Sequence, residues 1–303
     1  MISQANHAAA PRVSVLMTIY NAGPYLRAAI DSLIAQTFPD WELIAVENGS
    51  ADQSKSALKS YSDPRVRVFP LEKNIGRTPA LRLAFEQARG EYIAILDADD
   101  ISAPDRFAQQ VAFLDQHPDV ALVASWAQLI DEHGKVFDVF EPPANQKELQ
   151  DCLGWTNPLV HSSVTYRRES AQQVGGYPDL VWAQDLGLTL ALARRGKIAM
   201  IPAYLCQVRM LAASMTRSRK YQILIANELL LLFKQAADTL QLSARAHRLN
   251  RRALAIAEIK LGIATLRDDS FWKGLRMALH GLFTAPSALW GNGPVRRFFG
   301  AKF

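Results

Sequence analysis

The sequence predicts an α/β protein in which a mainly parallel β-sheet is flanked by helices and followed by an α-helical C-terminal region. Two observations carry this prediction. Over the first hundred residues, short β-rich apolar segments alternate with segments of helical periodicity, which is typical of a parallel sheet covered by helices. After residue 218 the pattern changes to long helical runs rich in Leu, Ala and Arg.

The first strand and helix are the clearest. RVSVLMTIY is apolar and β-rich, and the NAGPYL that follows contains the turn-forming residues Asn, Gly and Pro. A helix is predicted over Tyr25–Gln36 because Leu26, Ile30 and Leu33 fall on one face. This strand–turn–helix unit is the pattern that the next units repeat.

Further strands are predicted in WELIAVENGS, VRVFP and YIAILDADD, with helices over Asp52–Tyr61 and Thr78–Arg89 between them. Residues 104–150 are expected to hold a helix and the strand pair VALVASWAQLI and KVFDVF, and another helix lies near Asp185–Arg195. Polar clusters occur at 18–21, 47–52 and 97–100, where strands end. Ligands of such sheets bind beyond the carboxyl ends of the strands, so these clusters mark the predicted site.

Charge is distributed unevenly along the 303 residues. Residues 1–216 carry 19 Lys and Arg against 24 Asp and Glu, whereas residues 217–303 carry 15 bases and 5 acids. We therefore place a boundary near residue 217. An acidic body argues against nucleic-acid binding, and a basic tail favours contact with an anionic surface such as a membrane.

The sequence also bears on the compartment. Cys152 and Cys206 have no CxxC partner, which favours a reducing compartment. Met1–Arg12 lacks the apolar segment of a secretory signal, and the chain has no uninterrupted apolar run of about 20 residues. We therefore expect a cytoplasmic location, with any membrane association peripheral and on the inner face.

The acidic cluster Asp97, Asp99 and Asp100 follows the apolar run Tyr92–Leu96 directly. Carboxylates gathered in this way repel one another, but they suit a hard divalent cation, which prefers oxygen ligands. The alternative is the N-terminus of a helix that begins at residues 103–104 and is capped by Ser102. The preceding strand and the other polar clusters favour the cation.

Five short motifs occur in a fixed order. They are Val13, Ser14, Val15, Tyr20 and Asn21; Ser32, Gln36 and Thr37; VENGSAD at 46–52; Asn74, Gly76, Ala80 and Gly90; and Asp97–Ala98–Asp99 with Asp100 and Pro104. In this order the chain resembles the family 2 glycosyltransferases of GT-A fold over about residues 12–216. The resemblance implies a catalytic domain at 1–216, with a nucleotide-sugar half at about 12–103 and an acceptor half at about 104–216, followed by a basic helical region at 217–303.

The resemblance also assigns donor-site residues. It implies that the nucleotide-sugar is bound by Thr18, Tyr20, Asn21, Glu47, Asn74, Arg77, Asp97 and Ala98. Asp99 is expected to coordinate Mn²⁺ or Mg²⁺ at the diphosphate. Glu47 and Asn48 stand where the family usually has Asp, which leaves the identity of the base open. Simple packing at a strand end is the alternative for Tyr20.

A second set of residues belongs to the acceptor side. Asp185, after the turn Gly175–Gly176–Tyr177, matches the family's catalytic base; a carboxylate at a helix N-terminus is its alternative reading. Gln184 replaces the Glu of the family's Glu–Asp pair. His161 is expected to line the acceptor pocket, or else to be a structural histidine. Arg209 is expected to contact the diphosphate, and Leu211 stands where the family has a His.

Near the C-terminus, SFWKGLRMALHGLF at 270–283 spaces apolar residues along one helical face, with Lys273, Arg276 and His280 opposite. This composition is typical of a helix that lies in a membrane interface, and packing against its own domain is the alternative.

Together these features predict a metal-dependent, inverting glycosyltransferase. It would move a sugar from a nucleoside-diphosphate sugar to a hydroxyl of a glycan or lipid-linked acceptor in cell-envelope or capsular polysaccharide synthesis. A nucleotidyltransferase is disfavoured because TIYNAGPYL is not a Gly-rich phosphate loop with a Lys. A non-catalytic nucleotide-sugar or membrane-surface binding protein is the other alternative, motivated by Gln184, Asn48 and Leu211.

Overall fold

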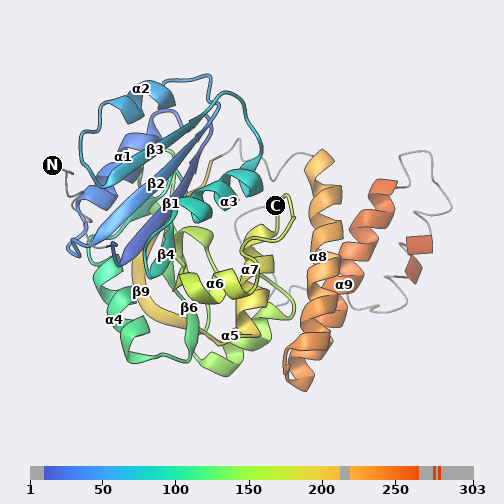
Figure 1. Ribbon diagram of the computed structural model, residues 1–303. Coiled ribbons are helices and arrows are strands. Elements are labelled where there is room, and N and C mark those ends of the chain that lie inside the picture. Colours follow the sequence, from blue (N-terminus) through green and yellow to red (C-terminus); the bar gives the residue numbers. More distant parts are fainter. Residues whose placement is uncertain (1–9, 212–218, 266–275, 278, 281–303) are drawn as a thin grey trace.

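The computed structural model describes residues 10–211, 219–265, 276–277 and 279–280 (Figure 1). Its strands are β1 Val13–Ile19, β2 Trp41–Asn48, β3 Val66–Leu71, β4 Tyr92–Ile95, β5 Ile101–Ser102, β6 Val120–Ile130, β7 Val136–Phe140, β8 Thr165–Arg167 and β9 Lys197–Arg209. Its helices are α1 Tyr25–Ile34, α2 Ser54–Lys59, α3 Arg77–Gln87, α4 Arg106–Gln116, α5 Gln146–Leu153, the 3₁₀ turn η1 His161–Ser163, α6 Arg168–Gln173, α7 Gln184–Ala193, α8 Arg219–Thr239 and α9 Ala244–Thr265.

The strands form one sheet with the order β3-β2-β1-β4-β8-β6-β9-β5, and β7 pairs with β6. β1 to β4 are parallel, as the alternating pattern predicted. The second half is mixed, because β8 is antiparallel to both β4 and β6 while β6 and β9 are parallel. The carboxyl ends of β1, β2 and β4 therefore meet along one edge, where the polar clusters lie.

Helices cover both faces of this sheet, and a hydrophobic core fills each interface. Side chains of β1 alternate between the two: Val15 and Met17 face one core and Leu16 the other. The first core is closed by α1, α2 and α4, and the second by α3, α5, α7 and α8 (Figure 1). This arrangement confirms the predicted α/β fold flanked by helices.

The helix predicted over Tyr25–Gln36 ends earlier, at Ile34. The reason lies in Gln36, whose amide nitrogen donates to Ser102 Oγ at 3.1 Å and to the Ala103 carbonyl at 2.6 Å. Gln36 thereby ties the end of α1 to β5. The alternative prediction that Ser102 caps the next helix is wrong, because Ser102 belongs to β5 and α4 begins at Arg106.

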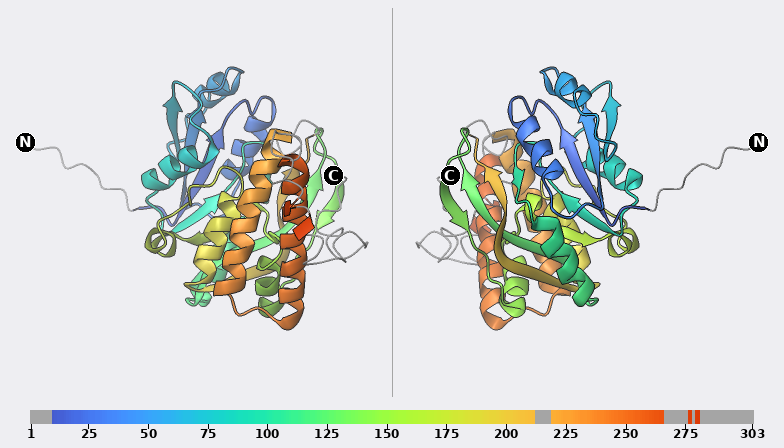
Figure 2. Two further views of the ribbon diagram at one scale, coloured as in Figure 1. Left: turned by 90° about the vertical axis from the view of Figure 1, so that its right-hand side faces the viewer. Right: turned by 90° about the vertical axis from the view of Figure 1, so that its left-hand side faces the viewer.

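The α8–α9 hairpin packs against the second core rather than standing apart from it (Figure 2). Leu232, Phe233 and Ala236 of α8 are buried in the same cluster as the strands and α7. The change of composition near residue 217 thus does not coincide with an end of the core. Within the described parts of the chain, no helix is both long and apolar enough to cross a membrane.

Most of the segment at 270–283 lies outside the described residues. Of the four that are described, Met277 packs against a small cluster formed by α8 and α9, and His280 Nδ1 lies 2.7 Å from Glu258 Oε2. Arg276 and Leu279 are exposed.

Candidate active site

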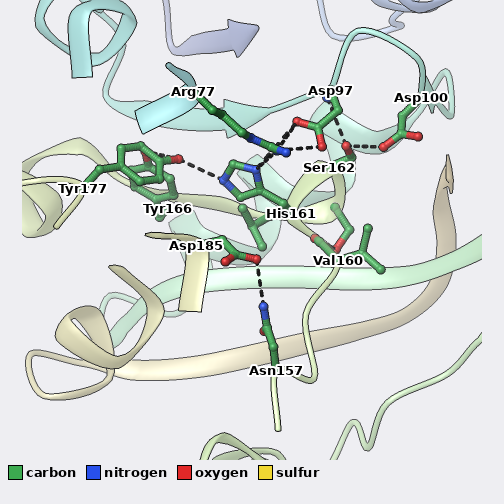
Figure 3. Close-up of polar contacts among 12 residues, drawn as sticks. Arg77, Asp97, Asp100, Asn157, Val160, His161, Ser162, Tyr166, Tyr177 and Asp185 are labelled. Carbon is green, nitrogen blue, oxygen red and sulfur yellow. Dashed lines mark hydrogen bonds and ion pairs between the residues drawn. The ribbon is translucent and has the colours of Figure 1, made fainter. Parts of the chain in front are cut away.

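Asp97 is paired with a cation of the protein itself (Figure 3). Arg77 Nη2, at the start of α3, donates to both carboxylate oxygens of Asp97, at 2.7 and 2.8 Å. Burial acts to raise the pKa of Asp97, but the Arg77 charge outweighs it and holds that pKa well below its usual range. Asp97 is therefore ionised and already neutralised.

Asp100 points into the protein. Its side chain is 4% exposed, and its two oxygens accept hydrogen bonds from Ser162 Oγ and, at 2.8 Å, from the Arg209 backbone N–H. Ser162 Oγ also accepts from the Asp97 backbone N–H at 3.0 Å, so this one serine fastens both ends of the acidic turn. Burial, with the charges of Asp97 and Asp99, raises the pKa of Asp100 well above its usual value. Asp100 is a structural anchor for the loop.

Asp99 differs from both. Within the described residues, its half-buried carboxylate has no hydrogen bond or ion pair to another residue. Burial, together with the neighbouring Asp97 charge, raises the pKa of Asp99 to about 6. An ionised carboxylate in this position gains from an added cation, because the cation offsets both the lost hydration and the repulsion.

These residues fit a divalent ion that binds together with a diphosphate. Among the residues that the structure describes, no group of three or more His, Cys, Asp and Glu side chains can hold a metal by itself. Mg²⁺ is often bound by one or two carboxylates plus substrate phosphates, and the unpaired Asp99 supplies such an oxygen ligand. Leu211, at the position of the expected His, supplies none.

His161 continues the network away from Asp97. Arg77 Nη2 lies 3.1 Å from His161 Nδ1, and His161 Nε2 lies 3.1 Å from the Tyr177 hydroxyl (Figure 3). Since Arg77 can only donate, Nδ1 acts as the acceptor and the ring proton is assigned to Nε2, which donates to Tyr177. His161 is held by these two contacts, as a structural histidine would be, and it also lines a pocket.

That pocket contains Asp185. Asp185 is the second residue of α7, and its Oδ2 accepts a hydrogen bond from Asn157 Nδ2 at 2.8 Å (Figure 3). The pocket is small, and Asp185, Asn157, His161 and Tyr177 are among its lining residues. The structure therefore brings together Asp97, Arg77, His161 and Asp185, which lie in different motifs.

The neighbouring Gln184 is 2% exposed, and its Oε1 has no hydrogen-bond partner within the described residues. The amide adds no charge beside Asp185, in contrast to the Glu that the family pattern contains.

The predicted base and ribose residues occupy the carboxyl ends of β1 and β2. Glu47 is 1% exposed; its Oε1 accepts from the Ser50 N–H at 2.6 Å, while Oε2 has no hydrogen bond among the described residues. Asn21 has a positive φ of 51°, and its Oδ1 accepts from the Ala51 N–H at 2.9 Å. Thr18 is half-buried, and Tyr20 is 48% exposed with its ring available for stacking.

The hydrogen bonds of Asn48 explain why this chain has an amide where the family pattern has a carboxylate. Its Nδ2 donates to Asn74 Oδ1 and to the Gly76 carbonyl, both at 3.2 Å, and its Oδ1 accepts from the Ile75 N–H at 2.9 Å. A carboxylate cannot donate, so the amide suits this tie between β2 and the loop at 74–76. Asn74 is exposed, and its predicted role as a donor ligand would use its remaining hydrogen-bonding capacity.

Arg209, at the end of β9, braces the acidic turn. Its Nε donates to the Asp99 carbonyl at 3.0 Å and its Nη1 to the Asp131 carbonyl at 2.8 Å. The guanidinium also lies over the ring of Tyr25, 4.5 Å from its centroid. Ala98 is 8% exposed in the same turn.

The residues that sequence reasoning missed are Ser162, Asn157 and Glu228. Ser162 directly follows His161, which was predicted from the sequence, but its hydrogen-bond partners were not predicted. Asn157 lies four residues before His161. Glu228, on α8, accepts hydrogen bonds from the loop just before Asp185, and no motif pointed to it.

Comparison with known proteins decides the family. The family model described as glycosyl transferase family 2 matches residues 14–175. The chain belongs to glycosyl transferase family 2. An uncharacterised glycosyltransferase of Methanocaldococcus jannaschii is 32% identical over 205 residues, which are 66% of this chain and 71% of that protein. The amylovoran biosynthesis glycosyltransferase AmsE of Erwinia amylovora is 30% identical over 202 residues, 65% and 75% of the two chains.

The fold of this family 2 glycosyltransferase also has a close match among solved structures. The mannosyltransferase PcManGT from Pyrobaculum calidifontis, in complex with GDP-Man and Mn²⁺, superposes with a TM-score of 0.59 at 21% identity, covering 94% of this chain and 89% of the other. At this identity the match shows the fold, and it confirms the GT-A architecture expected from the sequence.

Proposed function

We propose that this glycosyltransferase is an inverting, metal-dependent enzyme that uses a nucleoside-diphosphate sugar and glycosylates a hydroxyl of an envelope or capsular glycan. The observation that carries the proposal is that two carboxylates lie near the Arg77 charge. They are Asp99, which has no hydrogen bond or ion pair among the described residues, and Asp185, which accepts a hydrogen bond from Asn157 and lines a pocket. The acceptor class is supported by the relationship to the amylovoran enzyme AmsE.

In the proposed reaction, Asp185 takes the proton of the acceptor hydroxyl as that oxygen attacks the anomeric carbon. The new carbon–oxygen bond forms while the bond from the sugar to the diphosphate breaks, and its electron pair leaves with the diphosphate. Attack on the face opposite the leaving group inverts the anomeric configuration. A positioned base of this kind typically contributes about 10²–10⁴-fold.

The donor would be held by the strand ends. Glu47 has a buried Oε2 that makes no hydrogen bond within the described residues and lies 3.8 Å from Lys55 Nζ, so it could accept from a base or ribose donor. The exposed ring of Tyr20 offers a stacking surface. Asp97, kept ionised by Arg77, is placed to accept hydrogen bonds from ribose or sugar hydroxyls. The ion held by Asp99 and the diphosphate would neutralise charge on the leaving group.

The base assignment is tested by Asp185→Asn with Asp179→Asn as its matched control, since Asp179 lies in the preceding loop with a 94% exposed side chain. With a panel of nucleotide-sugars and Mn²⁺, we expect Asp185→Asn to lower kcat by about 10²–10⁴-fold and to leave donor affinity unchanged. Asp179→Asn should match the wild type. Equal turnover in all three proteins would remove the base role, and no turnover of any donor by the wild type would favour a binding protein.

The metal assignment is tested by calorimetry. Because one protein carboxylate alone binds Mn²⁺ weakly, we expect tight binding only when a nucleoside diphosphate is present. Asp99→Asn should abolish this mutual enhancement. Equal Mn²⁺ binding by wild type and Asp99→Asn would contradict the assignment.

A further inference from the structure

Glu228 of α8 binds the loop that leads into α7. Its Oε1 accepts from the Val181 N–H at 2.8 Å, and its Oε2 accepts from the N–H groups of Trp182 and Ala183, both at 2.9 Å. The glutamate is 7% exposed, so these three bonds are shielded from water. Three consecutive backbone donors thus converge on one carboxylate that lies 45 residues or more further along the chain.

The loop before α7 contains no side chain that caps the helix, and Glu228 binds that loop from α8. The residue before α7 is Ala183, whose side chain cannot accept a hydrogen bond. The N–H groups at a helix start need acceptors, and a negative charge there is favoured by the helix dipole. Glu228 provides a negative charge close to this helix start and an acceptor for the N–H of Ala183, the residue before α7, and its other two hydrogen bonds fix the loop.

The start of α7 determines where Asp185 lies. Asp185 is the second helical residue, so its Cα follows the position of the first turn. A loop freed from Glu228 would let this turn move or fray. Gly187, two residues after Asp185, packs closely against this loop, since a Cβ there would lie 2.6 Å from Pro178 Cγ.

The same hairpin also holds the partner of Asp185. Asn250 of α9 donates to the carbonyls of Gly154 and Phe233, which ties the segment before Asn157 to α8. The Ser243 N–H donates to Asp151 Oδ1 at 2.9 Å at the end of α5. The segment before Asp185 and the segment before Asn157 are therefore both hydrogen-bonded to the α8–α9 hairpin.

We infer that Glu228 is a positioning residue for the catalytic base and that the C-terminal hairpin is a working part of the active site. This inference rests on the proposed function of Asp185. Glu228 touches no substrate in this arrangement; it acts by fixing the backbone from which Asp185 projects.

The test compares Glu228→Gln with Leu240→Ala. The amide keeps one acceptor oxygen and turns an N–H₂ toward the backbone donors, so at least one of the three bonds is lost. Leu240 is buried in the same core beyond the end of α8, and its truncation leaves a cavity there without removing any hydrogen bond to the loop. We expect Glu228→Gln to lower kcat by about 10- to 100-fold at unchanged donor affinity, because small displacements of a catalytic group have effects of this size.

Leu240→Ala, in contrast, should lower thermal stability while kcat at 20 °C stays within about twofold of the wild type, since the base remains in place. Unchanged kcat in Glu228→Gln, or an equal loss in both variants, would overturn the inference.

Backbone hydrogen exchange provides a readout that needs no activity. The amides of residues 181–187 should exchange faster in Glu228→Gln than in Leu240→Ala, and equal exchange would overturn the inference. A wild type that transfers no sugar, combined with faster exchange in Glu228→Gln, would refute the proposed function while leaving the positioning of the loop established.

Discussion

At the end of β4, Asp97, Asp99 and Asp100 lie within four positions but meet different neighbours. Asp97 is neutralised by Arg77, Asp100 is buried against Ser162 and the Arg209 backbone, and Asp99 has no partner among the described residues. Three carboxylates can lie this close together because the protein itself supplies partners for two of them, Asp97 and Asp100. The remaining carboxylate is the one whose charge a ligand must balance.

This difference predicts how Asp99→Asn affects stability. The folded-state pKa of about 6 is above the ordinary value, so ionised Asp99 destabilises the metal-free protein fully above pH 6 and less as the pH falls toward 4. Asp99→Asn should therefore raise the free energy of unfolding at pH 7.5, by up to about 3 kcal/mol, with a smaller gain at pH 5. Urea denaturation without metal at both pH values measures this. The same gain at both, or a loss at pH 7.5, would contradict it.

A second prediction concerns Ser162, which bonds both Asp97 N and Asp100 Oδ2. Ser162→Ala leaves a buried N–H and a buried carboxylate oxygen each without this partner, so we expect a loss of about 1–3 kcal/mol in the free energy of unfolding. Ser163→Ala is the control, because Ser163 Oγ donates only to the nearby Val160 carbonyl, and it should cost about 1 kcal/mol or less. Urea denaturation of the two variants ranks them; equal losses would count against the anchoring role of Ser162.

At the scale of elements, the local pattern was sufficient for most strands and helices. Alternation and helical periodicity placed β1, β2, α1 and α3 within a few residues, because each buries one face against a neighbouring layer. The end of α1 and the identity of β5 escaped prediction. The end of α1 depends on Gln36 bonding Ser102 and Ala103, which lie more than sixty positions away in the sequence. β5 depends on antiparallel pairing with the end of β9, which is still further along the chain.

The loop between β2 and α2 yields a third prediction. Gly49 has φ +72°, and a Cβ there would lie 2.5 Å from the Lys73 carbonyl carbon. Gly49→Ala therefore combines backbone strain with a clash against backbone, and we expect it to cost about 2–4 kcal/mol and to weaken donor binding.

Gly175→Ala is the matched control, since it has φ +82° but nothing within 4 Å of a Cβ. It should lose only the strain, about 1 kcal/mol, and keep donor affinity. Thermal shift with and without nucleotide gives both quantities, and equal donor affinity in both variants would argue against a donor role for this loop.

The candidate site shows the same division between local and long-range information. Motifs located Asp97, Asp99, His161 and Asp185, because each follows a recognisable strand or turn. They did not indicate that Arg77 would occupy both oxygens of Asp97, since the two residues come from different elements. Glu228 had no signal at all: an isolated Glu on a helix is normally a solvent-exposed residue.

At the scale of the whole molecule, the C-terminal region combines two different parts. The α8–α9 hairpin is built into the second core and into the loop before Asp185. Beyond it, Met277 packs on the hairpin while Arg276 and Leu279 remain exposed. The packing alternative is thus supported at Met277, and membrane contact by the rest of this segment stays a prediction.

This surface gives the last prediction. Residues 217–303 carry 15 bases and 5 acids, so the full chain should bind vesicles that contain anionic lipid, and weakly or not at all vesicles of neutral lipid. Each basic residue near the membrane contributes about 1 kcal/mol, so Lys273→Glu with Arg276→Glu should weaken binding by at least about 10- to 30-fold at 0.1 M salt.

Arg194→Glu with Arg195→Glu changes the charge equally on an exposed part of the catalytic body and serves as the control in vesicle flotation. An equal loss in both double variants would mean that net charge, rather than the C-terminal segment, governs attraction to the membrane. A loss confined to the C-terminal pair would place the membrane contact in the segment beyond the α8–α9 hairpin.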